Sequence, residues 1–151
     1  MSEPKDVRRL VEAVTGRPGY TSAVGTRVVA ATPGCVEMAL DRRPDLLQAN
    51  GFFHGGVITG LADHAAGAAV TSALPEGRFA VTVSLQINFL APATGETLIA
   101  RARALQAGRT FGVAQVDVSS TAQGAEQVCA VATVTLRVVD LPAATRDPHT
   151  A

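Results

Sequence analysis

Residues 54–74 read HGGVITGLADHAAGAAVTSAL, and the rest of the fold follows from how this segment is buried. Nearly all of its side chains are small or apolar, and its length approaches the ~20 residues that cross a bilayer. Asp63 and His64 lie at its centre, however, and a charge at mid-membrane costs at least ~2.5 kcal/mol. A segment that is apolar all round and does not cross a membrane is typical of a helix inside a globular core. We therefore predict a buried central helix.

Strand patterns precede and follow this helix. Residues 79–90 alternate apolar and polar side chains with the period of two that is typical of a half-buried strand. Turn signals such as Pro33-Gly34 separate neighbouring segments of the same kind. The other predicted elements are a short amphipathic helix at 4–16, strands at 25–32, 35–41, 97–106, 110–120 and 126–138, and a loop at 42–53.

Together these elements predict an α+β fold, in which an antiparallel sheet of about six strands wraps one long central helix. We expect an N-terminal helix and linker at 1–24, one folded domain at 25–140 and a disordered tail at 141–151. A flank of the helix and the sheet edges would stay uncovered in a monomer, so we also expect a homodimer.

Composition argues against several classes of function. Thirteen basic and thirteen acidic residues cancel, so we expect neither a nucleic-acid nor a membrane partner. His54 and His64 are ten residues apart, about 15 Å along a helix, which is too far to share a metal ion. Cys129 has the setting of a buried structural thiol, and Cys35 has no activating partner. We expect no metal and no cofactor, and the lack of a disulfide framework or signal peptide favours the cytoplasm.

The first candidate site feature is His54-Gly55-Gly56, where the central helix begins. Two glycines here lower helix propensity by ~1 kcal/mol each relative to alanine. They also let a ligand approach free N–H groups at the positive end of the helix dipole, which is typical of an anion or oxyanion site. A flexible helix entry with a capping His54 would explain the same residues.

The second feature is Asp63, the only acidic residue between His54 and Leu74. A buried lone carboxylate is costly unless it is paired, hydrogen-bonded or functional. Asp63 is therefore either a catalytic acid or a hydrogen-bonded core residue. His64 points about 100° away around the helix, so it forms no dyad with Asp63 and is expected to face a neighbouring element or the dimer seam.

Polar residues flank the helix on both sides. The strand at 79–90 carries a polar row on one face, and a solvated sheet face is the favoured explanation of that row. The loop before the helix contains two amides that serve either as turn residues or to orient a ligand. The residues are Thr82, Ser84, Gln86 and Asn88 in the row, and Gln48 and Asn50 in the loop.

The spacing of Gly55 and Asp63 carries more information than either residue alone. They are eight residues apart, which places them ~12 Å apart along a helix and ~80° apart around it. One reacting carbonyl cannot contact both groups of the same helix, because catalytic contacts need ~3 Å. If both act on one substrate, a twofold dimer must supply Asp63 from the second subunit.

Three segments resemble the PaaI-like branch of the hotdog-fold thioesterases, relatives of the 4-hydroxybenzoyl-CoA thioesterases. They are QANGFFHGGVITGLAD at 48–63, VTVSLQINFLAPA at 81–93 and GRTFGVAQVDV at 108–118. The resemblance implies a hotdog fold, which agrees with the sheet and helix predicted above. It also implies hydrolysis of acyl-CoA thioesters without metal or cofactor, by dimers or dimer-of-dimers tetramers.

The resemblance also implies roles for individual residues. By position, Gly55 matches the residue whose N–H polarises the thioester carbonyl, and His54 supports that loop. Asp63 matches the catalytic acid, either nucleophile or general base, and Thr82 a hydroxyl that helps to orient water. Gly67 departs from a related branch, which has threonine one turn after its acid. The other implied contacts are Gln48, at a position that is often asparagine, and Arg109, near the CoA phosphates; we add Asn50 and Gly56 as substrate contacts.

We therefore expect an acyl-CoA thioesterase. A hotdog dehydratase would need a different His/Asp pairing, which the sequence does not offer. A non-catalytic acyl-CoA-binding module or ligand sensor is the alternative of another class, and it would leave the acid Asp63 unexplained.

Overall fold

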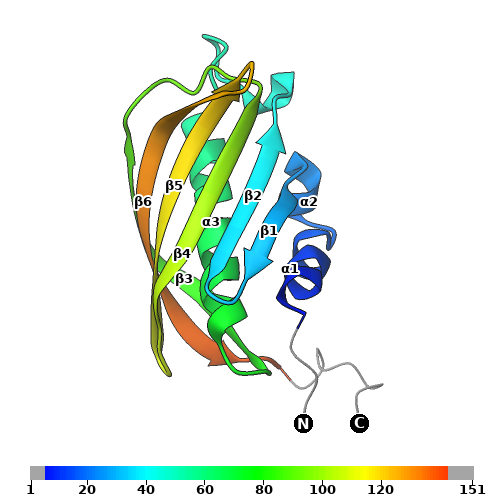
Figure 1. The fold of residues 1–151 in the computed structure, drawn as a ribbon, viewed down its shortest axis with the longest axis vertical. Coiled ribbons are helices and arrows are strands. Elements are labelled where there is room, and N and C mark those ends of the chain that lie inside the picture. The colour runs from blue at the N-terminus through cyan, green and yellow to red at the C-terminus, as the bar shows by residue number, and fades with distance from the viewer. Residues whose placement is uncertain (1–5, 143–151) are drawn as a thin grey trace.

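The central helix α3 spans Gly55–Ala73, in agreement with the buried helix predicted from the sequence. The computed structural model describes residues 6–142 (Figure 1). Two short helices precede the sheet, and most of the strands agree with the predicted ones to within two residues. The other elements are α1 (Val7–Thr15), α2 (Tyr20–Val24), β1 (Arg27–Thr32), β2 (Cys35–Asp41), a 3-10 turn (Pro44–Leu46), β3 (Arg78–Phe89), β4 (Thr97–Ala107), β5 (Phe111–Ala122) and β6 (Ala125–Asp140).

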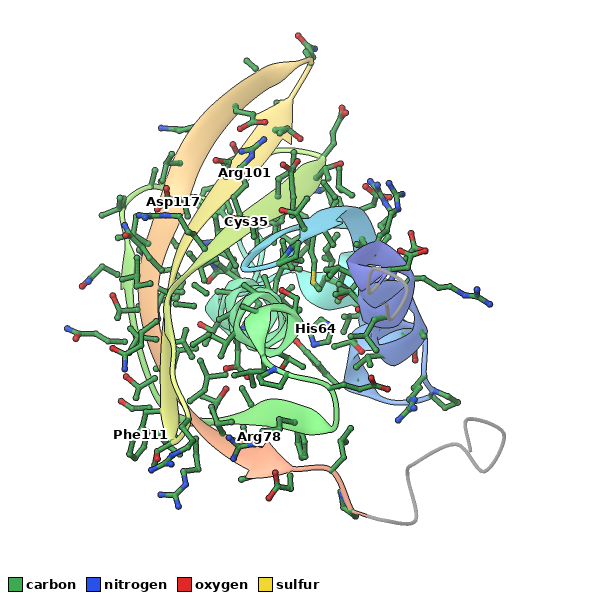
Figure 2. The ribbon with its side chains drawn as sticks, turned by 60° about the horizontal axis from the view of Figure 1, so that its bottom comes forward. Cys35, His64, Arg78, Arg101, Phe111 and Asp117 are labelled. Atoms are coloured by element: carbon green, nitrogen blue, oxygen red, sulfur yellow. The ribbon has the colours of Figure 1, made fainter. Side chains whose placement is uncertain are left out.

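A six-stranded antiparallel sheet curves around α3, as Figures 1 and 2 show from two directions. The strand order is β1-β2-β4-β5-β6-β3. Sequence neighbours pair in the hairpins β1–β2, β4–β5 and β5–β6, whereas β3 pairs with β6 and not with β4. The predicted α+β fold, with a sheet wrapped around one helix, is confirmed.

Small side chains on α3 let the sheet come close to the helix. Ala62, Ala65 and Ala66 have no exposed surface, and a methyl group added to Gly112 of β5 would collide with Val70 of α3. Alanine and glycine therefore set the short distance between the two layers, because a close-packed interior leaves no room for larger groups. The apolar residues of the strands fill the remaining core.

A β-bulge in β3 changes the predicted polar row. The pairing with β6 skips Val83, so that Thr82 and Ser84 lie opposite consecutive residues of the partner strand. An extra residue in one strand switches the faces of the side chains beyond it. Thr82 is half-buried and hydrogen-bonded to α3, whereas Ser84, Gln86 and Asn88 are exposed. The prediction of four polar side chains on one face is therefore wrong, and only three of them form a solvated row.

β3 is also an edge strand with exposed apolar side chains. Val81, Val83 and Phe89 have exposed fractions of 46%, 57% and 53%, and Leu90, directly after the strand, has one of 60%. Within residues 6–142, β6 is the only strand that pairs with β3. Bare, apolar strand edges are normally covered in soluble proteins. The opposite edge of the sheet, β1, is flanked by α1 and α2 (Figure 1).

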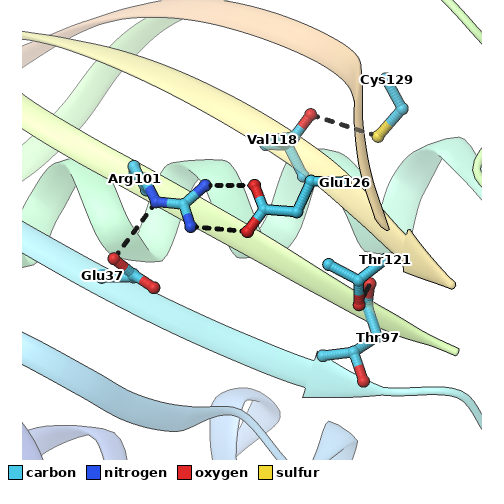
Figure 3. A network of polar contacts seen from close by, with 7 residues as sticks. All are labelled: Glu37, Thr97, Arg101, Val118, Thr121, Glu126 and Cys129. Carbon is cyan, nitrogen blue, oxygen red and sulfur yellow. Dashed lines mark hydrogen bonds and ion pairs between the residues drawn. The ribbon is translucent and has the colours of Figure 1, made fainter. Parts of the chain in front are cut away.

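The outer face of the sheet carries a polar network (Figure 3). Arg101 of β4 contacts Glu126 of β6 through two hydrogen bonds of 2.8 Å, and Glu37 of β2 at 3.2 Å. The Arg101 guanidinium lowers the pKa of Glu126. Because Arg101 and Glu126 are exposed and Glu37 is partly exposed, solvent screens the network, which orders this face more than it stabilises the fold.

The N-terminal segment packs on the core. Val7 and Val11 of α1 are buried. The sequence pattern does not predict α2, because the predicted first helix ends at Gly16 and the following segment is predicted as a linker. The expected start of that helix at residues 4 and 5, and nearly all of the expected tail at 141–151, lie outside the described residues. No helix within residues 6–142 is long and apolar enough to cross a membrane.

Candidate active site

The N-terminus of α3 presents one free backbone N–H group. His54 is the N-cap residue, and its Nδ1 accepts a hydrogen bond of 2.9 Å from the N–H of Gly56. This arrangement places the imidazole proton on Nε2. The N–H of Gly55 has no intrahelical acceptor, because it belongs to the first turn, and it donates to no other residue within the described range. Of the two glycines, Gly55 is thus the one with an available donor.

Phe89 of β3 lies against Gly55. A Cβ added to Gly55 would lie 3.3 Å from Cζ of the Phe89 ring, a tight contact. The glycine therefore leaves room for the ring, and the ring places an apolar wall beside the free N–H. Weak solvation strengthens the interaction of a donor with a developing negative charge.

Asp63 lies in the middle of α3 and is partly buried. Its Oδ1 accepts a hydrogen bond of 2.7 Å from Oγ1 of Thr82 in β3. The bulge at Val83 makes this contact possible, because it leaves Thr82 on the helix side of the strand. Thr82 thereby supplies a hydroxyl to the acid. Residue 67, one turn after Asp63 on the helix, is a glycine and has no hydroxyl to offer.

His64, the neighbour of Asp63, faces α1. Its Nε2 lies 2.9 Å from Oγ1 of Thr15, in agreement with the expectation that it contacts a neighbouring element (Figure 2). Burial lowers the pKa of His64, and the nearby charge of Asp63 opposes that shift. The imidazole thus fastens α1 to α3 on a different side of the helix from Asp63.

Both cysteines lie apart from these groups. Cys129 is fully buried, and its thiol donates to the carbonyl of Val118 at 3.3 Å (Figure 3). Burial raises the pKa of this thiol, which disfavours the thiolate. Cys35 is exposed on the outer face of the sheet. Within residues 6–142, no three His, Cys, Asp or Glu side chains come together as a metal site.

The loop amides before α3 hold the loop itself. Asn50 Oδ1 accepts from the N–H of Phe52 at 3.2 Å, which is the geometry of an Asx turn. Gln48 Nε2 is directed at the carbonyl of Phe53, at a distance of 3.5 Å. Both residues are exposed, so their side chains lie at the surface next to His54.

Arg109 occupies the turn between β4 and β5, at the end of the sheet where α3 ends. Its carbonyl accepts a hydrogen bond of 2.8 Å from Arg78 at the start of β3. Gly55 and Arg109 of one chain therefore lie near opposite ends of α3. The 19 residues of this helix correspond to a length of about 28 Å. Within one chain, Asp63 lies beside Thr82, and His54 lies beside Gly55 and Gly56. The first pair does not come together with the second group.

The helix contacts of two aromatic residues near the site were not predicted. Phe89 is the last residue of a strand that was predicted correctly, but nothing in its sequence indicates the contact with Gly55. Tyr20 of α2 lies against Gly60 of α3, where a methyl group would collide with its hydroxyl. The isolated glycine in the middle of the helix was the one available signal of such a close approach.

Comparison with protein families matches residues 50–127 to the thioesterase superfamily. The chain belongs to the thioesterase superfamily. The match covers the start of α3, Asp63, the whole of β3 and the following hairpin. The predicted class of enzyme, a thioester hydrolase, is thereby confirmed.

Known structures and proteins resemble the chain over most of its length. A thioesterase family protein from Silicibacter pomeroyi is 31% identical, with a TM-score of 0.85 over 89% of this chain and 98% of that one. Human acyl-coenzyme A thioesterase 13 is 27% identical over 82% of this chain and 89% of its own length. The PaaI protein of Escherichia coli shares the fold, with a TM-score of 0.78 over 90% of this chain and 96% of that one at 22% identity. The resemblance to the PaaI-like hotdog thioesterases is confirmed.

Proposed function

We propose that this superfamily member is an acyl-CoA thioesterase, which hydrolyses an acyl- or aryl-CoA thioester to the free acid and CoA. The free N–H of Gly55 at the positive end of α3, on a helix that also carries the hydrogen-bonded acid Asp63, is the observation that supports it most strongly. Thioester hydrolysis requires an oxyanion donor and a group that attacks or activates water.

The Gly55 N–H would polarise the thioester carbonyl and stabilise the oxyanion, an effect of about 3 kcal/mol for one donor in other enzymes. Asp63 then acts in one of two ways. It either attacks the carbonyl carbon, to give an anhydride that water opens, or it removes a proton from the attacking water. In both routes one water is consumed, the C–S bond breaks and the CoA thiolate takes up a proton; the oxygen of water enters the acid product directly in the general-base route, and enters either the product or Asp63 when the anhydride opens.

The site is shared between two subunits in this proposal. A continuous helix keeps Gly55 and Asp63 of one chain ~12 Å apart, whereas two antiparallel helices related by a twofold axis would bring Gly55 of one chain to Asp63 of the other. The bare, apolar edge of β3 supports pairing with a second copy of the chain. The assembly is a homodimer or a dimer-of-dimers tetramer.

Supporting residues complete the proposed site. His54 holds the helix N-terminus by capping Gly56, and Thr82 orients Asp63 and the water. Gln48 and Asn50 line the entrance through their exposed loop, and Arg109 contacts the phosphates of CoA. Two free cysteines agree with a reducing compartment, and we place the enzyme in the cytoplasm.

A thiol-release assay on a panel of acyl-CoAs tests the proposal, with Asp63→Asn as the matched inactive variant. The panel spans short aliphatic, long aliphatic and aryl-acetyl thioesters. Release by wild type at a rate well above that of Asp63→Asn is the expected result. Tight binding of acyl-CoA without any release would contradict the proposal and favour a non-catalytic binding module.

A further inference from the structure

One side of α3 carries no fully buried residue. Successive residues of an α-helix are about 100° apart, and the buried residues of α3 fall on one side of it, among them Ile58, Leu61, Ala65 and Ala69. The opposite side contains Gly56, Gly60, Asp63 and Gly67, none of which is buried. The candidate catalytic acid therefore belongs to a partly exposed side of the helix at which three positions are glycine, and its own contact there is with Thr82 of β3.

Tyr20 stands at this side of α3. A Cβ added to Gly60 would lie 3.0 Å from ring atoms Cε1 and Cζ of Tyr20, closer than ordinary contact. The ring can occupy this position only because residue 60 has no side chain. Tyr20 is 55% exposed, and its hydroxyl has no hydrogen-bond partner among residues 6–142. Much of the ring is therefore free to contact a ligand.

The position of Tyr20 is fixed by its neighbours. Thr21 Oγ1 donates to the carbonyl of Thr15 at 3.1 Å, and Thr15 Oγ1 in turn contacts Nε2 of His64 on α3. α1 and α2 are thus fastened to the helix that carries Asp63. A side chain held by such contacts forms a defined wall, which a residue on a loose loop would not.

The ring and the acid lie in the same turn of α3. Gly60 and Asp63 are three residues apart, about 4.5 Å along the axis and 60° around it. Phe89, at Gly55, bounds the other flank of the helix. An acyl group that extends from a carbonyl at Asp63 toward Gly60 would contact the Tyr20 ring.

We propose that Tyr20 is a specificity-determining residue, whose ring limits the bulk of the acyl group that fits beside Asp63. The inference rests on the proposed function, because it assumes a thioester carbonyl at Asp63. Removing the ring leaves space for longer or branched acyl groups, and short acyl groups lose an apolar contact. Pocket walls of this kind change discrimination between homologous substrates by about 10-fold to 200-fold.

Steady-state kinetics on acetyl-, butanoyl-, octanoyl- and dodecanoyl-CoA test the inference with Tyr20→Ala and two controls. Tyr20→Phe keeps the ring and removes only the hydroxyl. Phe111→Ala truncates another aromatic, 43% exposed, at the far end of the sheet near Arg137. We expect Tyr20→Ala to raise the dodecanoyl-to-butanoyl ratio of kcat/KM about tenfold, while both controls keep the wild-type ratio.

The outcomes separate this inference from the function on which it rests. An active wild type whose ratio changes less than about threefold in Tyr20→Ala overturns the role of Tyr20 alone. A wild type that releases no thiol from any acyl-CoA overturns the proposed function and this inference with it. Tyr20→Leu, which keeps an apolar contact on Gly60 with shorter reach, provides the same comparison if alanine lowers the melting temperature.

Discussion

Thr82 Oγ1 and Asp63 Oδ1 lie 2.7 Å apart, in a hydrogen bond that joins β3 to α3 at the candidate acid. The hydroxyl is the donor, since an ionised carboxylate only accepts. The bond fixes one oxygen of the acid, and no other hydrogen bond within residues 6–142 holds the second oxygen, which could act on water or on a carbonyl. The strand that forms the exposed edge of the sheet therefore also orients the acid, so the edge and the site are mechanically connected.

Asp63→Asn should lower kcat to less than about a tenth of the wild-type value. The amide keeps the volume of the side chain and an oxygen that accepts from Thr82, but it loses the charge that nucleophilic or base chemistry requires. Thiol release at saturating acyl-CoA measures the effect, and an unchanged melting temperature confirms the fold. A variant that keeps more than a tenth of kcat would exclude Asp63 as the catalytic acid.

Thr82→Val should reduce kcat by about tenfold to a hundredfold, the range expected when a hydrogen bond to a charged group is lost. Valine has the same shape as threonine, so packing in the half-buried position is preserved. Thr82→Ser keeps the hydroxyl and should retain most of the activity. Equal kcat values for the serine and valine variants would show that the hydroxyl does not serve the reaction.

Mixing Asp63→Asn with Gly55→Val should restore activity that neither variant has alone. Valine at position 55 crowds the Phe89 ring and obstructs the free N–H. In a mixed dimer one site has both lesions and the other has neither, so an equal mixture should reach about a quarter of wild-type activity after exchange. Subunit exchange is verified with differently tagged chains, and no recovery after verified exchange would indicate a site within one chain.

Arg109→Ala should raise KM for acyl-CoA several-fold with little change in kcat. The chemistry is a pantetheine arm away from the phosphates, so a lost phosphate contact weakens binding and leaves the reaction step intact. The contact of the Arg109 carbonyl with Arg78 does not depend on the replaced side chain. An acyl-pantetheine substrate, which has no nucleotide, is the control: its KM should not change. Identical KM values on acyl-CoA would remove Arg109 from the site.

His64 should make the stability of the protein depend on pH. Burial lowers its pKa from the usual value of about 6.5, so the unfolded chain binds a proton at a higher pH than the native one does. The free energy of unfolding is therefore highest above pH ~6.5 and falls as the pH decreases toward the lowered native value. Urea denaturation at pH 7.5 and 5.0 should show a smaller loss of stability in His64→Gln than in wild type. Equal losses would contradict the assignment.

Local patterns predict the elements of this fold well. The helix at 55–73 follows from an apolar segment with a capping His54, and the six strands follow from their sequence patterns and turn signals. Pairing of β3 with β6 could not be predicted, because it depends on contacts between segments far apart in the sequence. The bulge at Val83 is hidden for the same reason: the alternation of 79–90 continues through it, and only the partner strand reveals the skipped residue.

Local sequence patterns likewise predict some residues of the candidate site but not those placed by tertiary contacts. His54, Gly55 and Asp63 are visible in the sequence because each breaks the expectation for a buried helix, whether by glycine at its start or by a charge at its centre. The half-buried Thr82 was assigned from the resemblance alone, since the alternation placed it in the solvated row. Tyr20 had no signal of its own, because its neighbour Gly60 belongs to another segment and the contact is tertiary.

The two edge strands of the sheet, β1 and β3, differ in how they are covered, and this difference limits pairing with further copies of the chain. β1 is flanked by α1 and α2, while β3 presents unpaired backbone groups. A sheet with one bare border can be extended only once, by a second copy that brings its own bare border, and the joined sheet then has a shielded strand at each outer end. In the proposed dimer, this asymmetry of the single chain allows two copies to pair through β3 and leaves no bare edge for a third copy.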